Sequence, residues 1–232
     1  MSLSIIIPAR NEELNIVKSI NSLRRILKNS INYEVLVIDD FSTDSTYEAV
    51  KNIKTKNILV HKNHSKGLGG AINLGIKKAK KEYIVFFMAD SSDSPKDLLK
   101  YYCSIRASGV DAIFGSRFIK GSKVVDYPKF KLLLNRSANN AIKFLTNYDC
   151  NDFTNAFKIY RRSKLNQIKI ESSSFSIFLE IPLKFLLKKF SFSVMPISWH
   201  NRDHGHSNFR INELTFEYIK IFFRFLLARI KI

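Results

Sequence analysis

Short apolar runs alternate with helix-like segments in the first half of this chain, and this alternation restricts the possible folds more than any other feature. Five runs suit buried strands, at residues 3–7, 34–38, 57–61, 83–87 and 112–115. Apolar residues recur at helical spacing over 11–27, and Ser94-Pro95 is typical of a helix start. Continuous apolar strands that alternate with helices predict an α/β fold, with a mostly parallel central sheet and helices on both faces.

The second half of the chain continues this pattern less regularly. We predict strands at 157–160 and 192–196, and a helix with an apolar face over 175–189. A last helix, over 213–232, is rich in Phe, Ile and Leu. Because we find no internal repeat and no low-complexity linker, we predict one domain over residues 1–210 and a C-terminal amphipathic helix over 211–232.

The charge balance is strongly basic, with 38 Lys and Arg against 20 Asp and Glu, a net charge of +18. Such a balance favours nucleic acid, an acidic membrane surface or a phosphate-bearing substrate as partner. The two cysteines, Cys103 and Cys150, are too few for a disulfide framework and indicate reduced thiols. No run reaches about 18 apolar residues, and no basic segment precedes the first one. We therefore expect a cytoplasmic protein with no signal peptide and no membrane span.

Carboxylates gather where the second and fourth predicted strands end. In open α/β sheets, ligands bind beyond the carboxyl ends of the strands. Asp39 and Asp90 directly follow apolar runs, where they suit a divalent cation, a ribose or a base. Asp40, Asp44 and Asp93 are equally well explained as helix caps.

The glycine-rich segment 66–70 resembles a dinucleotide-binding turn only in part. Ile72 occupies the position of the third glycine, and the segment follows the third strand rather than the first. We expect a tight turn with close helix packing. The three histidines His200, His204 and His206 do not have a zinc spacing, and we expect a substrate-closing loop there.

Basic residues follow the fifth predicted strand. Arg117 ends the sequence Gly115-Ser116-Arg117, and Lys131 and Arg136 lie on the next predicted helix. Guanidinium groups bind phosphate oxygens in a bidentate way, so these residues suit a phosphate or diphosphate. Metal-holding carboxylates beside phosphate-holding cations indicate a site for a nucleotide diphosphate and its transfer chemistry.

Seven segments, in this order, carry a resemblance to a known family. They are SIIIPARNE (4–12), VLVIDDFSTD (35–44), KGLG (66–69), MADSSDSP (88–95), GSR (115–117), NDFTNAFK (151–158) and RDHGHS (202–207). The chain resembles the family-2 glycosyltransferases of the GT-A fold, and more closely the polyprenyl-phosphate (dolichyl-phosphate) mannosyltransferase-like branch. The resemblance spans residues 2–208.

The resemblance implies a role for individual residues at the donor. The residues implied to line the donor nucleotide are Pro8, Arg10 and Glu12, with Val37 and Asp39 at the base, Ala89 and Asp90 at the diphosphate and metal, and Arg202 closing over the donor. The family pattern at the end of the fourth strand is Asp-x-Asp, but Met88 replaces the first Asp here. Because thioethers bind Mg²⁺ and Mn²⁺ poorly, the expected Mg²⁺ or Mn²⁺ ion depends on Asp90.

The resemblance also implies the reaction and its acceptor. Arg117 would face the reacting phosphate, and Lys131 and Asn135 would bind the acceptor phosphate, so that Asp90, Arg117 and Lys131 are the expected catalytic residues. We expect transfer of a hexose, mannose or glucose, from a nucleotide diphosphate-sugar to a polyprenyl phosphate, with inversion. A phosphate monoester, with a second pKa near ~6, is a competent nucleophile at neutral pH without a general base.

Three other functions compete with this interpretation. A family-2 glycosyltransferase acting on a sugar hydroxyl, in cell-surface polysaccharide or lipopolysaccharide synthesis, would need a base, for which Asp152 is the best candidate. A nucleotidyltransferase usually begins with a glycine-rich basic loop, which residues 8–12 are not. Nucleic-acid binding is disfavoured because the basic residues accompany an acidic cleft that would repel a polyanion, so we expect no nucleic-acid partner.

The last predicted helix indicates a membrane partner. Glu217, Lys220, Arg224 and Lys231 fall on one helical face, and Phe, Ile and Leu cover the rest. A wide apolar face with a cationic stripe suits the plane of a membrane interface, especially an anionic one. Packing on the domain or on a second subunit is the alternative. We expect a peripheral protein on the cytoplasmic face of a membrane.

Overall fold

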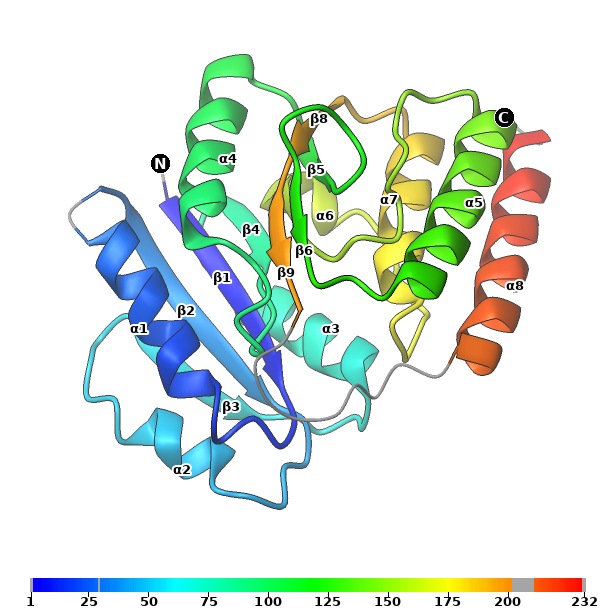
Figure 1. Cartoon of the computed structure of the whole chain (residues 1–232). Coiled ribbons are helices and arrows are strands. Elements are labelled where there is room, and N and C mark those ends of the chain that lie inside the picture. Colours follow the sequence, from blue (N-terminus) through cyan, green and yellow to red (C-terminus); the bar gives the residue numbers. More distant parts are fainter. Residues whose placement is uncertain (1, 29, 202–210, 231–232) are drawn as a thin grey trace.

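The computed structural model of the chain describes residues 2–28, 30–201 and 211–230. Its centre is a seven-stranded sheet with the order β3-β2-β1-β4-β7-β5-β8 (Figure 1). These strands are β1 (Ser2–Ala9), β2 (Asn32–Asp39), β3 (Ile58–Lys62), β4 (Tyr83–Phe86), β5 (Ala112–Ser116), β7 (Lys158–Arg161) and β8 (Phe192–Pro196). Neighbours pair in parallel, except that β7 runs antiparallel to both β4 and β5. The prediction of an α/β fold with a mostly parallel sheet is confirmed.

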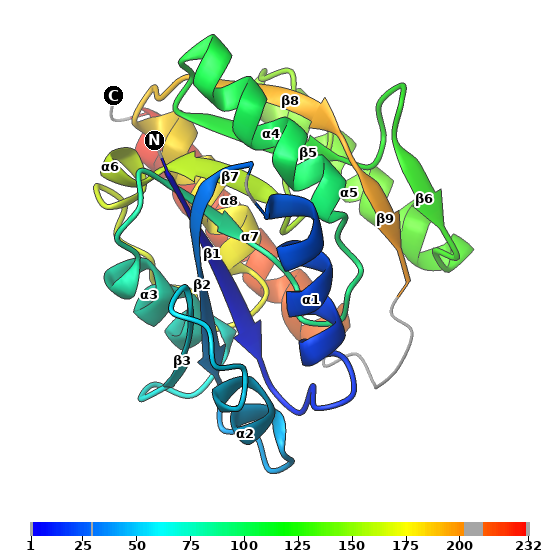
Figure 2. The ribbon, with the colours of Figure 1, turned by 90° about the vertical axis from the view of Figure 1, so that its left-hand side faces the viewer.

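Helices cover both faces of the sheet, as predicted. Figure 2 looks onto the face covered by α1 and α4, with α7 and α8 behind the sheet. The helices are α1 (Ile16–Leu27), α2 (Thr46–Lys51), α3 (Leu68–Lys78), α4 (Pro95–Ser108), α5 (Lys129–Thr146), α6 (Arg162–Leu165), α7 (Ile177–Leu187) and α8 (Ile211–Ile230). Because side chains alternate along a strand, Ile5 and Ile7 join one core cluster with α1 and α4, whereas Ile6 joins the other, with α3 and α7.

The helix predicted over 11–27 begins later than expected, at Ile16. Asn11 has a positive φ of 56°, which breaks a helix. The backbone N–H groups of Asn11 and Glu12 donate to Ser42 Oγ (3.0 Å) and Thr46 Oγ1 (2.8 Å). These long-range hydrogen bonds fold the segment after β1 against the start of α2, so it forms a loop at the edge where β1 and β2 end.

A small second sheet was not predicted. It pairs β6 (Lys123–Val125) in parallel with β9 (Ser198–His200). Each strand has only three residues and no apolar run, so nothing local in the sequence marks it. No helix in the described parts of the chain combines the length and the apolarity that a membrane crossing needs.

The glycine-rich segment forms the tight turn and close helix contact that the sequence predicted. Gly67 precedes α3 with a φ of 109°, a conformation that favours glycine. The N–H of Gly69 donates to the carbonyl oxygen of Ser173 (2.9 Å). A Cβ atom added to Gly69 would lie 1.9 Å from the carbonyl oxygen of Ser172, so only glycine allows α3 to approach the 172–173 backbone this closely.

We expect Gly69→Ala to lower the free energy of unfolding by about 1–3 kcal/mol, because the new methyl group meets a backbone oxygen that cannot rotate away. The matched control is Asn73→Ala, at a half-buried position of the same helix. It should change stability by less than about 1 kcal/mol, in the stabilising direction, because alanine has the higher helix propensity. Urea denaturation measures both variants, and equal stability of Gly69→Ala and the wild type would contradict the prediction.

Candidate active site

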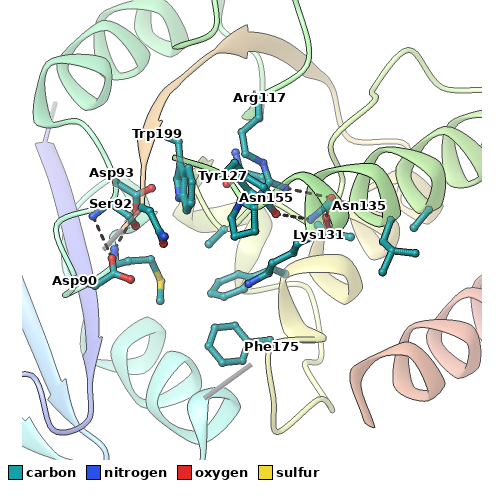
Figure 3. A pocket seen from close by; sticks show the side chains of 18 of the residues that line it. Asp90, Ser92, Asp93, Arg117, Tyr127, Lys131, Asn135, Asn155, Phe175 and Trp199 are labelled. Atoms are coloured by element: carbon teal, nitrogen blue, oxygen red, sulfur yellow. Dashed lines mark hydrogen bonds between the residues drawn. The ribbon is translucent and has the colours of Figure 1, made fainter. Parts of the chain in front are cut away.

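A pocket of about 360 Å³ lies where β4 and β5 end (Figure 3). The loop after β4, Arg117 after β5 and the loop before β7 form one part of its wall. The rest comes from α5 and the residues just before it, from the segment around the start of α7, from α8 and from β9 (Ser198–His200). Four of the predicted site residues line this one pocket: Asp90, Arg117, Lys131 and Asn135. The structure therefore brings the predicted metal, reacting-phosphate and acceptor-phosphate residues together, although they come from three separate segments.

The acidic part of the wall follows β4 and contains two buried carboxyl groups. The Oδ1 atom of Asp90 accepts a hydrogen bond from the backbone N–H of Ser92 (3.1 Å), and Asp93 Oδ2 accepts one from Met88 N–H (3.0 Å). Burial raises the pKa of Asp93 from 3.8 to about 7; the hydrogen bond from Met88 lowers it and the charge of Asp90 raises it. Asp93 does not cap α4, because the side chain of Ser94 takes that role.

The structure also shows what Asp44 and Asp40 do, the other two carboxylates that the sequence left open as helix caps. Asp44 accepts hydrogen bonds from Thr46 N–H (3.0 Å) and Glu13 N–H (3.2 Å), so it stabilises the start of α2. Asp40 accepts from Gly67 N–H (2.9 Å) and from the side chain of Asn63 (2.8 Å). Asp40 therefore fixes the glycine turn before α3.

The basic part of the wall is organised by a buried ion pair. Arg117 Nε and Nη2 donate to the two carboxylate oxygens of Asp152 at 2.8 and 2.7 Å, and the backbone N–H of Arg117 donates to the same group (2.9 Å). The Arg117 side chain is 8% exposed and that of Asp152 is 0% exposed. This bidentate pairing holds the guanidinium group in one orientation at the pocket.

Asp152 was the best sequence candidate for a general base toward a sugar hydroxyl, and its surroundings in the structure disfavour that role. Its carboxylate has no exposed surface, and three N–H groups of Arg117 already bind it. Asp152 does not line the pocket, whereas a general base must come within hydrogen-bond distance of the hydroxyl that it deprotonates. Asp152 is instead the residue that orients Arg117.

Asn135 lies at the centre of a second polar network in the pocket wall. Its Oδ1 atom accepts hydrogen bonds from Asn139 Nδ2 (2.6 Å), Thr154 Oγ1 (3.1 Å) and Arg117 Nη2 (3.4 Å). Its Nδ2 atom donates to the Tyr127 hydroxyl (3.1 Å), to which Arg117 Nη1 also donates (3.3 Å). These bonds connect α5 to the loop before β7, so the side chain on α5 and the guanidinium group keep a fixed relative position.

Five predicted donor residues, Pro8, Arg10, Glu12, Val37 and Asp39, lie in or directly after β1 and β2 and do not line this pocket, and Ala89 follows β4. Pro8 and Ala89 are buried, Arg10 is exposed, and Glu12 is half-buried. Val37 is 0% exposed and packs in the core, so its side chain does not reach the surface. Their roles stay predictions. Arg202, with the rest of the predicted closing loop at 202–207, lies outside the described residues.

Asp39 is the exception among these donor residues, because its environment itself points to a ligand. The residue is 5% exposed, and its Oδ1 atom is buried with no hydrogen-bond partner in the described part of the chain. A buried acceptor without a partner costs about 1–3 kcal/mol. A hydrogen-bond donor on a bound molecule would satisfy it.

Sequence reasoning missed several pocket residues, above all Tyr127 and Trp199. The two rings lie 4.8 Å apart between centroids, and Trp199 also forms an isolated β-bridge with Asp93. Tyr127 precedes Pro128 and α5, and Trp199 lies in the unpredicted strand β9. The one available signal was that Trp199 is the single tryptophan of the chain and precedes the predicted closing loop.

Comparison with known proteins decides the family. The model of "Glycosyl transferase family 2" matches residues 4–169, which is most of the chain and includes both parts of the pocket wall that follow β4 and β5. This chain belongs to glycosyltransferase family 2. The family assignment agrees with the resemblance seen in the seven sequence segments.

The names of two curated relatives of this glycosyltransferase refer to dolichol phosphate and to polyprenol monophosphomannose. A dolichol-phosphate mannosyltransferase of Pyrococcus furiosus is 29% identical over 231 residues, which cover 97% of this chain and 64% of the relative. A polyprenol monophosphomannose synthase of Mycolicibacterium smegmatis is 26% identical over 213 residues, 88% of this chain and 79% of the relative. The chain therefore spans less than two thirds of the length of the Pyrococcus enzyme.

Solved structures confirm the predicted GT-A fold of this glycosyltransferase. TarS 1-349 of S. aureus, in complex with UDP-GlcNAc, matches with a TM-score of 0.70 and 21% identity. The match covers 98% of this chain and 66% of the TarS chain. Glucosyl-3-phosphoglycerate synthase of Mycobacterium tuberculosis matches with a TM-score of 0.71 and 16% identity, over 98% of this chain and 79% of the synthase chain. That synthase was solved with Mn²⁺, UDP and glucosyl-3-phosphoglycerate.

Asp90 is the pocket residue through which this family-2 glycosyltransferase would hold a divalent cation. No group of three or more His, Cys, Asp or Glu within the described ranges is placed to hold a metal ion. Asp90 offers an oxygen ligand at the pocket, whereas Met88 contributes a thioether beside it. Since Mg²⁺ commonly takes one or two carboxylates together with substrate phosphates, Asp90 would hold the ion mainly in the presence of a donor diphosphate.

We expect Arg117→Ala to lower the free energy of unfolding by about 3–5 kcal/mol, because it leaves the Asp152 carboxylate buried without its cation. In the double variant Arg117→Ala/Asp152→Asn the buried group is neutral and its oxygen still accepts from the residue 117 N–H. The loss in the free energy of unfolding of the double variant should therefore differ from the sum of the two single losses by about 0.5–3 kcal/mol. Urea denaturation of the two single variants and the double variant measures this coupling; strictly additive losses would contradict it.

Proposed function

We propose that this glycosyltransferase moves a hexose, mannose or glucose, from a nucleotide diphosphate-sugar to a polyprenyl phosphate, with inversion at the anomeric carbon. The supporting observation is the pocket, in which a carboxylate-bearing wall faces Arg117 and Lys131 (Figure 3). One wall suits a diphosphate with its cation, and the other suits a second phosphate. The names of the two curated relatives agree with such an acceptor.

The donor nucleotide would bind at the ends of β1 and β2. The Oδ1 atom of Asp39, which has no hydrogen-bond partner among the described residues, suits an N–H group of a nucleobase, and Val37 lies two residues earlier in β2. Pro8 lies at the end of β1, Arg10 and Glu12 follow the strand at the same edge, and Arg202 would close over the donor. This arrangement leaves the diphosphate directed toward Ala89 and Asp90.

The acceptor phosphate would be bound by Arg117, Lys131 and Asn135. A phosphate monoester needs positioning more than deprotonation, because its second pKa is near ~6. The orientation of the Arg117 guanidinium group is fixed by Asp152, so it offers a preformed electrostatic site for the nucleophile. A divalent cation at Asp90 would act as a Lewis acid that stabilises the leaving diphosphate.

The environment of Asp152 favours a phosphate over a sugar hydroxyl as acceptor. A hydroxyl would need a base, and the best sequence candidate for it is buried beneath Arg117. The acceptor side of the pocket is also apolar beyond its cations, with Leu134, Phe175 and Phe178 in the lining. An apolar lining suits the first isoprene units of a lipid.

A membrane partner is supported by the outer surface of α5 and α8. The two helices lie side by side, with Arg229 Nη1 donating to the carbonyl oxygen of Thr146 (2.8 Å). Exposed large apolar side chains cover both helices: Phe130, Leu133, Leu134, Phe144, Leu145, Phe216, Ile219, Phe223, Leu227 and Ile230. We name these ten residues the α5–α8 surface.

The α5–α8 surface suits the interface of an anionic membrane. Exposed apolar residues here alternate with exposed cations such as Lys220 and Arg224. The opposite side of α8 packs on the domain through Phe225, which is 3% exposed, and this packing leaves the outer side of the helix available for lipid. We propose peripheral attachment at the cytoplasmic face of a membrane, with residues 211–232 and α5 in contact with lipid.

A screen of nucleotide sugars against acceptors tests the proposed function. The purified protein should transfer a hexose to a short polyprenyl phosphate, read by mass spectrometry, and not to a free saccharide. Transfer to a saccharide hydroxyl alone would overturn the proposal. A parallel titration with Mg²⁺ and Mn²⁺ reads the metal requirement.

We expect Lys131→Ala to lower kcat/KM for the acceptor by about 10- to 100-fold, the effect of losing a charge-assisted hydrogen bond to phosphate. The KM for the donor should stay within about twofold, since Lys131 lies on the acceptor side. Lys129→Ala, an exposed lysine one half-turn earlier on α5, is the matched control and should behave as the wild type. Equal losses in the two variants would show that only general charge matters.

We expect Phe144→Asp and Phe223→Asp each to weaken binding to vesicles that contain anionic lipid by about tenfold or more, because each removes a large apolar side chain from the lipid contact. Their exposed fractions are 84% and 60%. Leu14→Asp, at a 72% exposed position before α1, is the control and should bind as the wild type. Co-sedimentation gives the bound fraction, and unchanged binding of both Phe variants would contradict membrane contact.

A further inference from the structure

Lys158, the first residue of β7, is a charged group buried behind the pocket that the proposed reaction does not use. It is 1% exposed, and its Nζ atom donates to the carbonyl oxygens of Phe153 (2.9 Å) and Asn155. The aromatic ring of Phe114 lies 5.7 Å from the ammonium group. The amine thus holds two carbonyl groups of the loop that leads into its own strand.

This loop, residues 151–155, fixes the acceptor side of the pocket at several points. Asp152 orients the Arg117 guanidinium group, and Thr154 donates to Asn135. Asn155 Nδ2 donates to the carbonyl oxygen of Gly115 (3.0 Å), two residues before Arg117. The carbonyl groups that Lys158 binds therefore lie between and beside the residues that position Arg117 and Asn135.

A buried ammonium group is unfavourable for folding, which argues for a role other than stability. Burial lowers the pKa of Lys158 from 10.5 to about 8, Asp152 and Cys150 raise it in part, and Arg117 lowers it. An apolar side chain of similar length would avoid the cost of removing a charge from water. What only the ammonium group provides is two strong, directed hydrogen bonds to the loop.

We propose that Lys158 is a positioning residue of the acceptor site: its ammonium group holds the 153 and 155 carbonyl groups and so keeps Asp152, and with it the Arg117 guanidinium group, aligned for the acceptor phosphate. The inference rests on the proposed transfer reaction. It concerns a residue that contacts neither donor nor acceptor. Small displacements of a phosphate-binding group lower catalysis strongly, since the reacting atoms must approach in line.

The effects of pH on activity and on stability distinguish positioning from a purely structural role. Loss of the proton above pH 8 weakens the hold on the loop, so kcat should fall in that range. The free energy of unfolding should change in the opposite direction to kcat. Between pH 8 and 10.5 the unfolded chain binds more protons at Lys158 than the folded chain does, so the contribution of this residue to stability rises with pH. The stability of the wild type relative to Lys158→Met should therefore rise over this range while kcat of the wild type falls.

The test compares the wild type, Lys158→Met and Lys158→Arg over pH 7–10, with whichever acceptor the wild type uses, so that a wrong acceptor is not mistaken for a wrong role of Lys158. Lys158→Met should lower kcat by about 10- to 100-fold at pH 7, leave the KM for the donor within twofold, and lose the alkaline decrease. Lys158→Arg keeps the charge and should recover part of kcat without the alkaline decrease. Lys184→Met, which removes a lysine that also donates to a backbone carbonyl but lies on α7, is the control.

Two results would overturn the inference. One is a folded Lys158→Met, judged by thermal denaturation, that keeps the kcat of the wild type. The other is an alkaline decrease that persists unchanged in Lys158→Met or Lys158→Arg. If Lys158→Met does not fold, the pH profile of the wild type alone tests the inference. A kcat that stays constant from pH 7 to 10 would then exclude a positioning role for the Lys158 ammonium group.

Discussion

The insertion of β7 between β4 and β5 is the constraint on which the rest of the site depends. Because β7 is antiparallel to both neighbours, its first residue lies at the edge where β4 and β5 end. The loop before β7 therefore falls between Asp90, after β4, and Arg117, after β5. A parallel strand at this place would put that loop at the opposite edge. The ion pair between Arg117 and Asp152 exists because of this one reversal in an otherwise parallel sheet.

The sequence predicted the elements whose signals are local. The apolar runs, the Ser94 cap, the glycine turn and the place of Arg117 at a strand end all follow from neighbouring residues, and the structure confirms them. The sequence did not predict what depends on distant contacts. The late start of α1 is caused by hydrogen bonds to α2, and β6 and β9 pair across more than seventy residues. The burial of Asp152 under Arg117, likewise, has no local signature.

The acceptor side of the pocket is built from groups that are costly to bury. Arg117, Asp152 and Lys158 are all removed from solvent, and Asp93 opposite them has a pKa raised by burial to about 7. The charged groups of Arg117, Asp152 and Lys158 each form several hydrogen bonds. These bonds replace the lost hydration and fix the geometry of the groups. The aromatic core behind them, including Phe114, Tyr160 and Phe185, provides the stability that such a polar site lacks.

Trp199 gives this arrangement an optical property. It is the single tryptophan of the chain, it lines the pocket, and its ring lies against Tyr127, which is hydrogen-bonded to Arg117. Indole emission depends on the polarity and mobility of its surroundings, and the tryptophan fluorescence of this protein arises from one side chain at one place. The molecule thus contains a native reporter on the occupancy of its own pocket, without any attached dye.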